Sequence, residues 1–195
     1  MKCDIVLAGV GGQGVLSVAA IIANAALKEG LQVKQSEVHG MAQRGGAVSA
    51  HLRLADHEIH SDQVPNGCAD LLLSVEPLEA LRYFGLLSPD GAVVSATQPF
   101  KNIGDYPALE EVLEKLRSFS RTILADADRL AKKAGLAKAA NVVLVGAASH
   151  LLPIKPETIE AHLREAFAAK GPQVVEANVR AFRLGRQAAA GPTCC

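Results

Sequence analysis

The sequence contains no tryptophan, and aromatic residues make up 4% of its 195 residues. A platform of aromatic rings for stacking nucleic-acid bases is therefore not expected. Basic and acidic residues are equal in number, 20 of each, so the formal net charge is zero. A neutral chain offers no bulk attraction for polyanions, and we expect no nucleic-acid partner.

Long apolar runs are missing as well. No run approaches the roughly 20 residues that cross a bilayer, so we expect no membrane partner. The first residues lead through Asp4 into a short apolar stretch and a glycine-rich segment, a pattern unlike that of a secretory signal. These features together predict a cytoplasmic protein.

The sequence also lacks a recognisable metal-binding pattern. None of the four cysteines belongs to a CxxC pair, so neither an iron–sulfur cluster nor a zinc site is expected in this chain. Cys194 and Cys195 end the chain after Gly191, and we expect residues 191–195 to form a flexible tail with free thiols, a redox or metal role being the alternative. His57 and His60 have acidic neighbours, but loop spacing fixes no ligand geometry.

The N-terminal part has the pattern of a strand–helix–strand unit. A short apolar run over 5–8 predicts a buried strand, and apolar residues recur at helical spacing from Val15 to Ala26, with Gly30 placed to end the helix. A second strand is expected over 31–35, followed by a polar loop over 36–46. Such a unit predicts parallel strands joined by a right-handed crossover.

The remaining sequence continues the α/β pattern. Residues 47–54 alternate between apolar and polar and predict a half-exposed strand, with His51 on its exposed face. Further strands are expected over 70–75, 91–95 and 122–125, and helices after Glu76, over 109–116, from Asp126 through Ala134, and over 142–152, 156–169 and 174–188. We therefore predict a single Rossmann-like three-layer α/β domain over 1–190, with a mostly parallel sheet and a helical C-terminal part.

Gly9, Gly11 and Gly14 have the GxGxxG spacing of a dinucleotide-binding turn. Glycines after a strand let backbone N–H groups approach a phosphate, and the following helix N-terminus favours negative charge. Glu37 comes after the second predicted strand, about where an NAD domain places its ribose-binding acid. The alternative is that the glycines merely permit a tight turn and close packing of helix and strand.

Three motifs carry a more specific signal: Gly9–Val15, Ser36–Gly46 and Glu76–Tyr83. Together with the stretches 141–154 and 178–185, they resemble the gamma subunits of 2-oxoacid:ferredoxin oxidoreductases over nearly the whole chain. The His-Gly-Met-Ala-Gln-Arg-Gly-Gly sequence within the second motif points to the indolepyruvate branch.

The resemblance implies an enzyme that oxidises a 2-oxoacid with CoA to acyl-CoA and carbon dioxide, and passes electrons to ferredoxin. Thiamine diphosphate with magnesium, and iron–sulfur clusters, carry this chemistry in the family. The sequence has neither the Gly-Asp-Gly…Asn-Asn thiamine signature nor spaced cysteines. We therefore expect that this chain binds no cofactor alone, that a large partner subunit holds the cofactors, and that the isolated chain is inactive and self-associates through the surface meant for that partner.

Our hypothesis for the site is a rim at the carboxyl ends of the parallel strands, where open α/β sheets bind ligands. We expect two segments to form it, a turn of Gly11, Gly12, Gln13 and Gly14, and a loop of Gln43, Arg44, Gly45 and Gly46. Arg44 would bind a carboxylate or phosphate with its planar guanidinium, and Gln13 would orient a polar group. His39 would act as acid or base, and Glu37 would contribute to binding.

Structural roles compete with each of these assignments. Arg44 would instead form a salt bridge or anchor an interface, Glu37 would order the loop, and His39 would cap it by hydrogen bonds. Two other functions also compete, an NAD(P)-binding Rossmann protein and a scaffold that merely orders its large partner.

Overall fold

The computed structural model describes residues 1–39, 45–101 and 103–190, so the predicted tail lies outside the described residues. Within them, one sheet of six strands has the order β2-β3-β1-β4-β5-β6. The strands are β1 (Lys2–Val10), β2 (Gln32–His39), β3 (Ala47–Ala55), β4 (Ala69–Ser74), β5 (Leu87–Ala96) and β6 (Thr122–Ala125). The pairs β1–β4, β4–β5 and β5–β6 are parallel, whereas β3 is antiparallel to both β1 and β2. The sheet is thus mostly parallel, as predicted.

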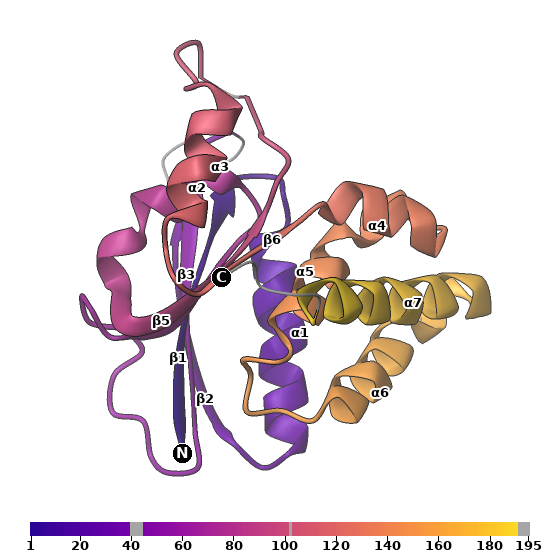
Figure 1. Cartoon of the computed structure of the whole chain (residues 1–195). Coiled ribbons are helices and arrows are strands. Elements are labelled where there is room, and N and C mark those ends of the chain that lie inside the picture. The colour runs from indigo at the N-terminus through magenta and orange to yellow at the C-terminus, as the bar shows by residue number, and fades with distance from the viewer. Residues whose placement is uncertain (40–44, 102, 191–195) are drawn as a thin grey trace.

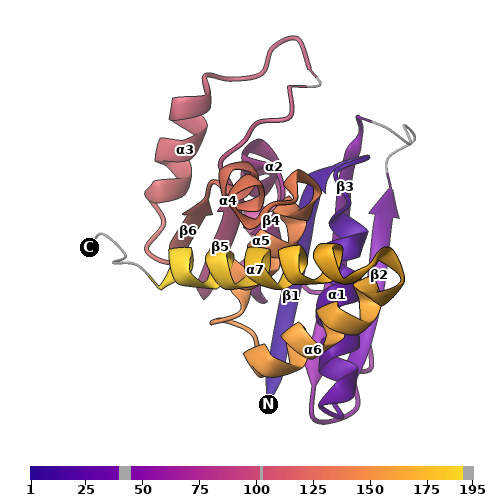
Figure 2. The same ribbon diagram turned by 90° about the vertical axis from the view of Figure 1, so that its right-hand side faces the viewer.

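The N-terminal unit differs from the prediction in two respects. β1 and β2 run in the same direction, but β3 lies between them, so they are not paired neighbours (Figure 2). β2 also continues to His39, four residues into the predicted loop, where Val38 pairs with Ser49 and His39 with Val48. The backbone ladder of this hairpin satisfies the N–H and C=O groups of a segment that has no apolar pattern of its own.

Seven α-helices accompany the strands in the described chain: α1 (Val15–Lys28), α2 (Pro77–Arg82), α3 (Leu109–Arg117), α4 (Ala127–Ala134), α5 (Ala140–Ala148), α6 (Pro156–Phe167) and α7 (Pro172–Ala189). Their ends follow local signals in the sequence. Pro77 occupies the first turn of α2, and the Asp126 side chain accepts a hydrogen bond from Arg129 N (3.1 Å) to cap α4. Gly135, with φ 92°, ends α4.

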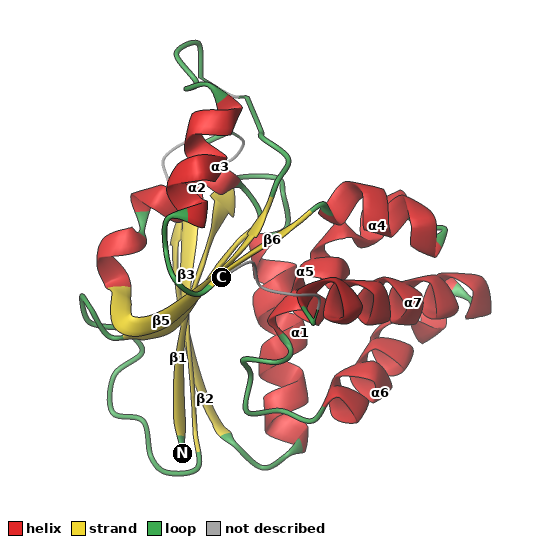
Figure 3. Ribbon diagram, in the orientation of Figure 1, coloured by secondary structure: helices red, strands yellow, loops and turns green. Residues whose placement is uncertain are grey.

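The helices cover the two faces of the sheet unequally. Figures 1 and 3 show α1 and α4–α7 on one side of the strands and α2 and α3 on the other, which confirms the three-layer class. The larger apolar cluster lies under α1 and α5, and the smaller one lies between β4, β5 and the pair α2–α3. The predicted buried helix over 142–152 exists as α5 and ends at Ala148.

The contact between α5 and α7 depends on two glycines. A Cβ added at Gly146 would lie 2.0 Å from the carbonyl oxygen of Phe182, and one added at Gly185 would lie 1.9 Å from that of Val143. Side chains at these positions are therefore excluded by backbone atoms of the opposite helix. The absence of both side chains lets the two helices pack backbone to backbone.

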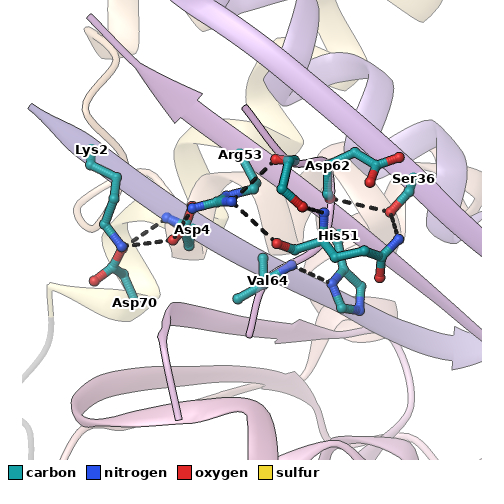
Figure 4. Close-up of polar contacts among 10 residues, drawn as sticks. Lys2, Asp4, Ser36, His51, Arg53, Asp62, Val64 and Asp70 are labelled. Carbon is teal, nitrogen blue, oxygen red and sulfur yellow. Dashed lines mark hydrogen bonds and ion pairs between the residues drawn. The ribbon is translucent and has the colours of Figure 1, made fainter. Parts of the chain in front are cut away.

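The outer face of β1 and β3 carries polar side chains that are buried rather than half exposed. Ser49 and His51 are 3% and 8% exposed, which makes the prediction of an exposed strand face wrong. The connection 56–68 lies over this face, and His51 Nδ1 accepts a hydrogen bond from Val64 N at 2.9 Å. Figure 4 shows this contact beside the ion pairs of Asp4 with Arg53 and Lys2.

Candidate functional site

The glycine turn between β1 and α1 has the form that the sequence predicts. Gln13 N donates to Val10 O at 3.0 Å, and Gly14 precedes α1 with φ 80°, a left-handed conformation that favours glycine. No side chain caps α1. The N-terminus of this helix therefore offers backbone N–H groups and a positive dipole end, the elements of an anion site.

The turn and the second loop lie against each other, as the proposed rim requires. Gly11 N donates to Gly46 O at 2.8 Å, and Gly45 N donates to Gly11 O at 3.2 Å. Gly45 also has a left-handed φ of 80°. Gln43 and Arg44 lie outside the described residues, and nothing is described of the His39 side chain. Their roles stay predictions.

Gln13 has a structural role that the sequence analysis did not anticipate. Its Oε1 accepts from Val10 N at 2.8 Å, and its Nε2 lies 3.5 Å from Val75 O. The side-chain amide thus bridges the ends of β1 and β4 instead of extending freely toward a ligand. One N–H of its NH₂ group has no partner in these contacts and is available to a ligand.

Asn141, at the start of α5, completes the turn from another part of the chain. Its Nδ2 donates to Gln13 O at 2.8 Å and to Gly14 O at 3.3 Å. A Cβ at Gly14 would lie 2.7 Å from this nitrogen, so the glycine is required by contact as well as by φ. Asn141 belongs to a stretch that carries the family resemblance, but the sequence gives no sign of this role, because more than a hundred residues separate it from the turn.

A crevice of about 220 Å³ opens at the carboxyl ends of β1, β4, β5 and β6. Gln13, Gln98, Phe100 and Asn141 contribute to its walls. A second hollow, of about 310 Å³, lies against the other side of the glycine turn, beside Gly11, Gly12 and Val48. The turn therefore separates two concave surfaces at the edge where α/β proteins bind ligands. Gln98 and Phe100 were not predicted as site residues.

Glu76, directly after β4, is a buried carboxylate beside this crevice. It is 1% exposed and caps α2 by accepting a hydrogen bond from Glu79 N at 2.8 Å. Its other oxygen accepts from Tyr106 Oη at 2.5 Å and from Phe100 N at 3.3 Å. Burial raises the pKa of Glu79, and Arg82, which donates to Glu79 at 3.0 Å, opposes that rise.

Glu37 was predicted to follow the second strand, and this prediction is wrong, because β2 extends to His39 and contains Glu37. Glu37 is exposed, pairs with Ala50 across the ladder, and accepts a hydrogen bond from Gln35 Nε2 at 2.7 Å. Because β3 lies between β1 and β2, Glu37 is one strand farther from the glycine turn than the ribose-binding acid of an adjacent β1–β2 pair, roughly an additional 5 Å.

No cluster of three or more His, Cys, Asp or Glu side chains suited to a metal ion is present in residues 1–39, 45–101 and 103–190. In the same part of the chain, no helix has the length and apolar character that a bilayer crossing requires.

Comparison with known proteins gives a consistent result along the chain. The family model for pyruvate ferredoxin/flavodoxin oxidoreductase matches residues 4–188. The chain is 39% identical over 194 residues to the indolepyruvate oxidoreductase subunit IorB of Archaeoglobus fulgidus, covering 95% of this chain and 94% of the relative.

Two solved structures have the same fold. The 2-oxoglutarate:ferredoxin oxidoreductase of Magnetococcus marinus matches with a TM-score of 0.79 and 22% identity, over 98% of this chain and 31% of that longer chain. The keto/oxoacid ferredoxin oxidoreductase gamma subunit of Geobacter sulfurreducens matches with a TM-score of 0.71 and 26% identity, over 97% and 99% of the two chains. The chain therefore belongs to the pyruvate ferredoxin/flavodoxin oxidoreductase family, as a gamma-type small subunit of the 2-oxoacid:ferredoxin oxidoreductases.

Proposed function

We propose that the chain is the small subunit of an indolepyruvate or aryl-pyruvate ferredoxin oxidoreductase, inactive without its large partner. The observation that carries this proposal is the likeness to the Archaeoglobus fulgidus subunit along almost the full length of both chains. The reaction converts the 2-oxoacid and CoA into acyl-CoA and carbon dioxide, and the two electrons released reduce ferredoxin. We place the complex in the cytoplasm.

The cofactors of this reaction belong, in this proposal, to the partner. Thiamine diphosphate with magnesium supplies the electron sink for decarboxylation, and iron–sulfur clusters accept the electrons. The described cysteines of this chain do not fit a cluster, because Cys3 is buried and Cys68 lies on a different segment. The contribution of this chain is therefore binding and positioning.

The rim at the carboxyl edge is the proposed point of contact with substrate. The Gly11–Gly46 and Gly45–Gly11 hydrogen bonds bring the two glycine segments together, next to the uncapped start of α1. In the proposal, the thiol-bearing arm of CoA or the 2-oxoacid lies against this rim, and Arg44 pairs with a carboxylate or phosphate of the substrate. The Magnetococcus marinus neighbour was solved with CoA bound, which supports CoA as a co-substrate in enzymes of this fold.

Mixing of subunits tests the proposal. The chain is expressed alone and with its candidate large subunit under anaerobic conditions, and viologen reduction is followed with indolepyruvate or phenylpyruvate plus CoA. We expect turnover in the mixture and none with either subunit alone. Turnover by this chain alone, or tight NADH binding by it, would overturn the proposal in favour of a nicotinamide-binding protein.

A scaffold without substrate contacts is the second candidate, because the Gln13 amide is already engaged by the backbone of β1 and β4. Replacing Arg44 separates the two. In the mixed complex, Arg44→Ala is expected to lower kcat/KM by on the order of 100-fold, and Arg44→Lys, which keeps the charge without the planar fork, by less. Full turnover with Arg44→Ala, at unchanged assembly, would establish the scaffold.

A further inference from the structure

The β5–α3 connection, residues 97–108, is attached at one side to the end of β6. Thr97 N donates to Ala125 O at 3.0 Å, and Gln98 Nε2 donates to Asp126 Oδ1 at 3.1 Å. These two bonds place the segment 97–100 across the carboxyl edge of the sheet. Gln98 and Phe100 thereby become one wall of the 220 Å³ crevice.

On its other side the described part of this connection contacts the Glu76 carboxylate, and the Leu78 backbone forms a further hydrogen bond with Tyr106. Glu76 Oε1 accepts from Phe100 N at 3.3 Å and from Tyr106 Oη at 2.5 Å. Both ends of the excursion between Phe100 and Tyr106 therefore meet at Glu76. The carboxylate is itself held in place, because its second oxygen caps α2 through Glu79 N at 2.8 Å.

The chemistry of this contact makes it a strong one. Burial, together with the hydrogen bond to the Glu76 carboxylate, raises the pKa of Tyr106, so the phenol remains a proton donor throughout the physiological range. A phenol that donates to a carboxylate forms a charge-assisted bond, which is about twice as strong as a bond between neutral groups. Because Glu76 is 1% exposed, water does not replace a lost donor readily.

The crevice wall carries acceptors that the protein does not use. The side-chain amide oxygens of Gln98 and Asn141, Oε1 and Oδ1, have no hydrogen-bond partner among the described residues, whereas the NH₂ groups of both side chains are engaged. The arm of CoA is narrow and contains two amide N–H groups, which are suitable donors for such oxygens. The phenyl ring of Phe100 adds an apolar surface beside them.

We propose that Glu76 and Tyr106 are positioning residues for CoA: they close the β5–α3 connection so that Gln98 and Phe100 form the wall against which the arm of CoA lies. Neither residue needs to touch the reacting atoms. This inference rests on the proposed function, since it assigns to that enzyme's co-substrate a place on this chain.

Steady-state kinetics of the assembled complex test the assignment to CoA. Tyr106→Phe removes the hydroxyl and keeps the ring. Tyr83→Phe is the matched control, because Tyr83 is also half-buried and packs against the smaller apolar cluster at the end of α2. We expect Tyr106→Phe to raise KM for CoA about tenfold. Without the hydroxyl, only a fraction of the molecules would hold Gln98 and Phe100 in the binding position, and the apparent affinity for CoA would fall by that fraction. The kcat and KM for the 2-oxoacid should stay within about twofold of wild type.

Hydrogen exchange of the full chain gives a second readout that does not depend on activity. The Phe100 amide should exchange on the order of tenfold faster in Tyr106→Phe and in Glu76→Gln, with the amides of α5 and α7 unchanged. A KM for CoA equal to wild type, or faster exchange throughout the helices, overturns the positioning role. If the wild-type mixture does not turn over with CoA, the proposed function fails instead, and the exchange at Phe100 still decides whether the pair holds the connection.

Discussion

The two ends of the β1–β3 pair are built from opposite kinds of residue. Where β1 begins and β3 ends, Asp4 is 1% exposed and accepts from Arg53 Nε at 2.7 Å and from Lys2 Nζ at 2.6 Å. Where β1 ends and β3 begins, the contacts are backbone bonds among Gly11, Gly45 and Gly46. Both ends belong to one antiparallel ladder, so the strands alone do not explain the difference.

The two ends differ in whether their polar groups are paired within the protein. At the Asp4 end the charges of Asp4, Arg53 and Lys2 pair with one another. Arg53 further donates to Ser61 O and Gln63 O, at 3.1 and 3.2 Å. At the glycine end the first turn of α1 has no side-chain cap, and two hollows open beside it. A hollow of about 320 Å³ also lies at the Asp4 end, but its charged groups Lys2, Asp4 and Arg53 pair with one another. The first end serves stability, and the second leaves donors for a ligand, which is where we place the function.

The largest expected effect is on stability, at the Asp4 end. Asp4→Ala leaves Arg53, whose side chain is 17% exposed, without its carboxylate, and should lower the free energy of unfolding by about 3 kcal/mol. Urea unfolding measures this, with the exposed Asp56→Ala as a control that should change little. Activity per assembled complex should be unaltered, and a loss of kcat by Asp4→Ala in fully folded complex would contradict the division between the ends.

A pH dependence belongs to the same group. Burial by itself would raise the pKa of Asp4, but the hydrogen bonds from Arg53 and Lys2 outweigh it and lower the pKa below 3.8. A depressed carboxyl pKa contributes stability above the unfolded value, and that contribution is lost as the pH falls through the folded value. The destabilisation by Asp4→Ala should therefore shrink as the pH falls below about 4.

The next effect, at the glycine end, should appear both in stability and in turnover of the complex, and should be larger for Gly14 than for Gly12. Gly14→Ala combines a left-handed φ of 80° with a contact of 2.7 Å to Asn141 Nδ2, whereas Gly12→Ala has a φ of 99° and no atom within 4 Å. We expect Gly12→Ala to cost about 1–2 kcal/mol of stability from backbone strain, and Gly14→Ala to cost more. Thermal unfolding and turnover of the complex compare the two. Equal turnover by both variants would contradict the role of the Gln13–Gly14–Asn141 contact.

The smallest expected effect is on the pH dependence of stability, through the titration of His51 on β3. Burial lowers the pKa of His51 below 6.5, against a weaker opposing effect of Asp62. Its contribution to stability is complete above the unfolded value and is lost as the pH falls through the folded value, because protonation of Nδ1 removes the acceptor for Val64 N. The difference in unfolding free energy between pH 7.5 and pH 5 should be smaller in His51→Gln than in wild type. An identical pH dependence would show that His51 does not titrate with folding.

Much of the fold was predictable because its signals are local. The β6 strand was predicted with its observed bounds, and the Asp126 cap and Gly135 end of α4 are encoded by the neighbouring residues. The extension of β2 to His39 and the burial of His51 were not predictable in this way. Both depend on segments that lie elsewhere in the sequence, β3 in the first case and the connection 56–68 in the second.

The candidate site shows the same division. The glycine turn follows from the GxGxxG spacing, since the residues, the strand and the helix are consecutive. Asn141, Glu76 and Tyr106 reach the site from three distant parts of the chain, and nothing in their spacing indicates that they meet. Gln13 is the opposite case. Its residue type suggested a contact with a ligand, but in the fold its side-chain amide binds the backbone of Val10.

The sequence by itself determined the α/β class, the glycine turn and, through its motifs, membership of the oxidoreductase family. It did so because strand and helix patterns, caps and turn glycines act within a few residues of each other. The tertiary structure alone decided that β3 separates β1 from β2, that polar residues of β3 are buried, and that Glu76 joins the β5–α3 connection to the crevice. These outcomes depend on which distant segments exclude water from a polar group and supply its hydrogen bonds, and the residues next to that group in the chain do not specify them.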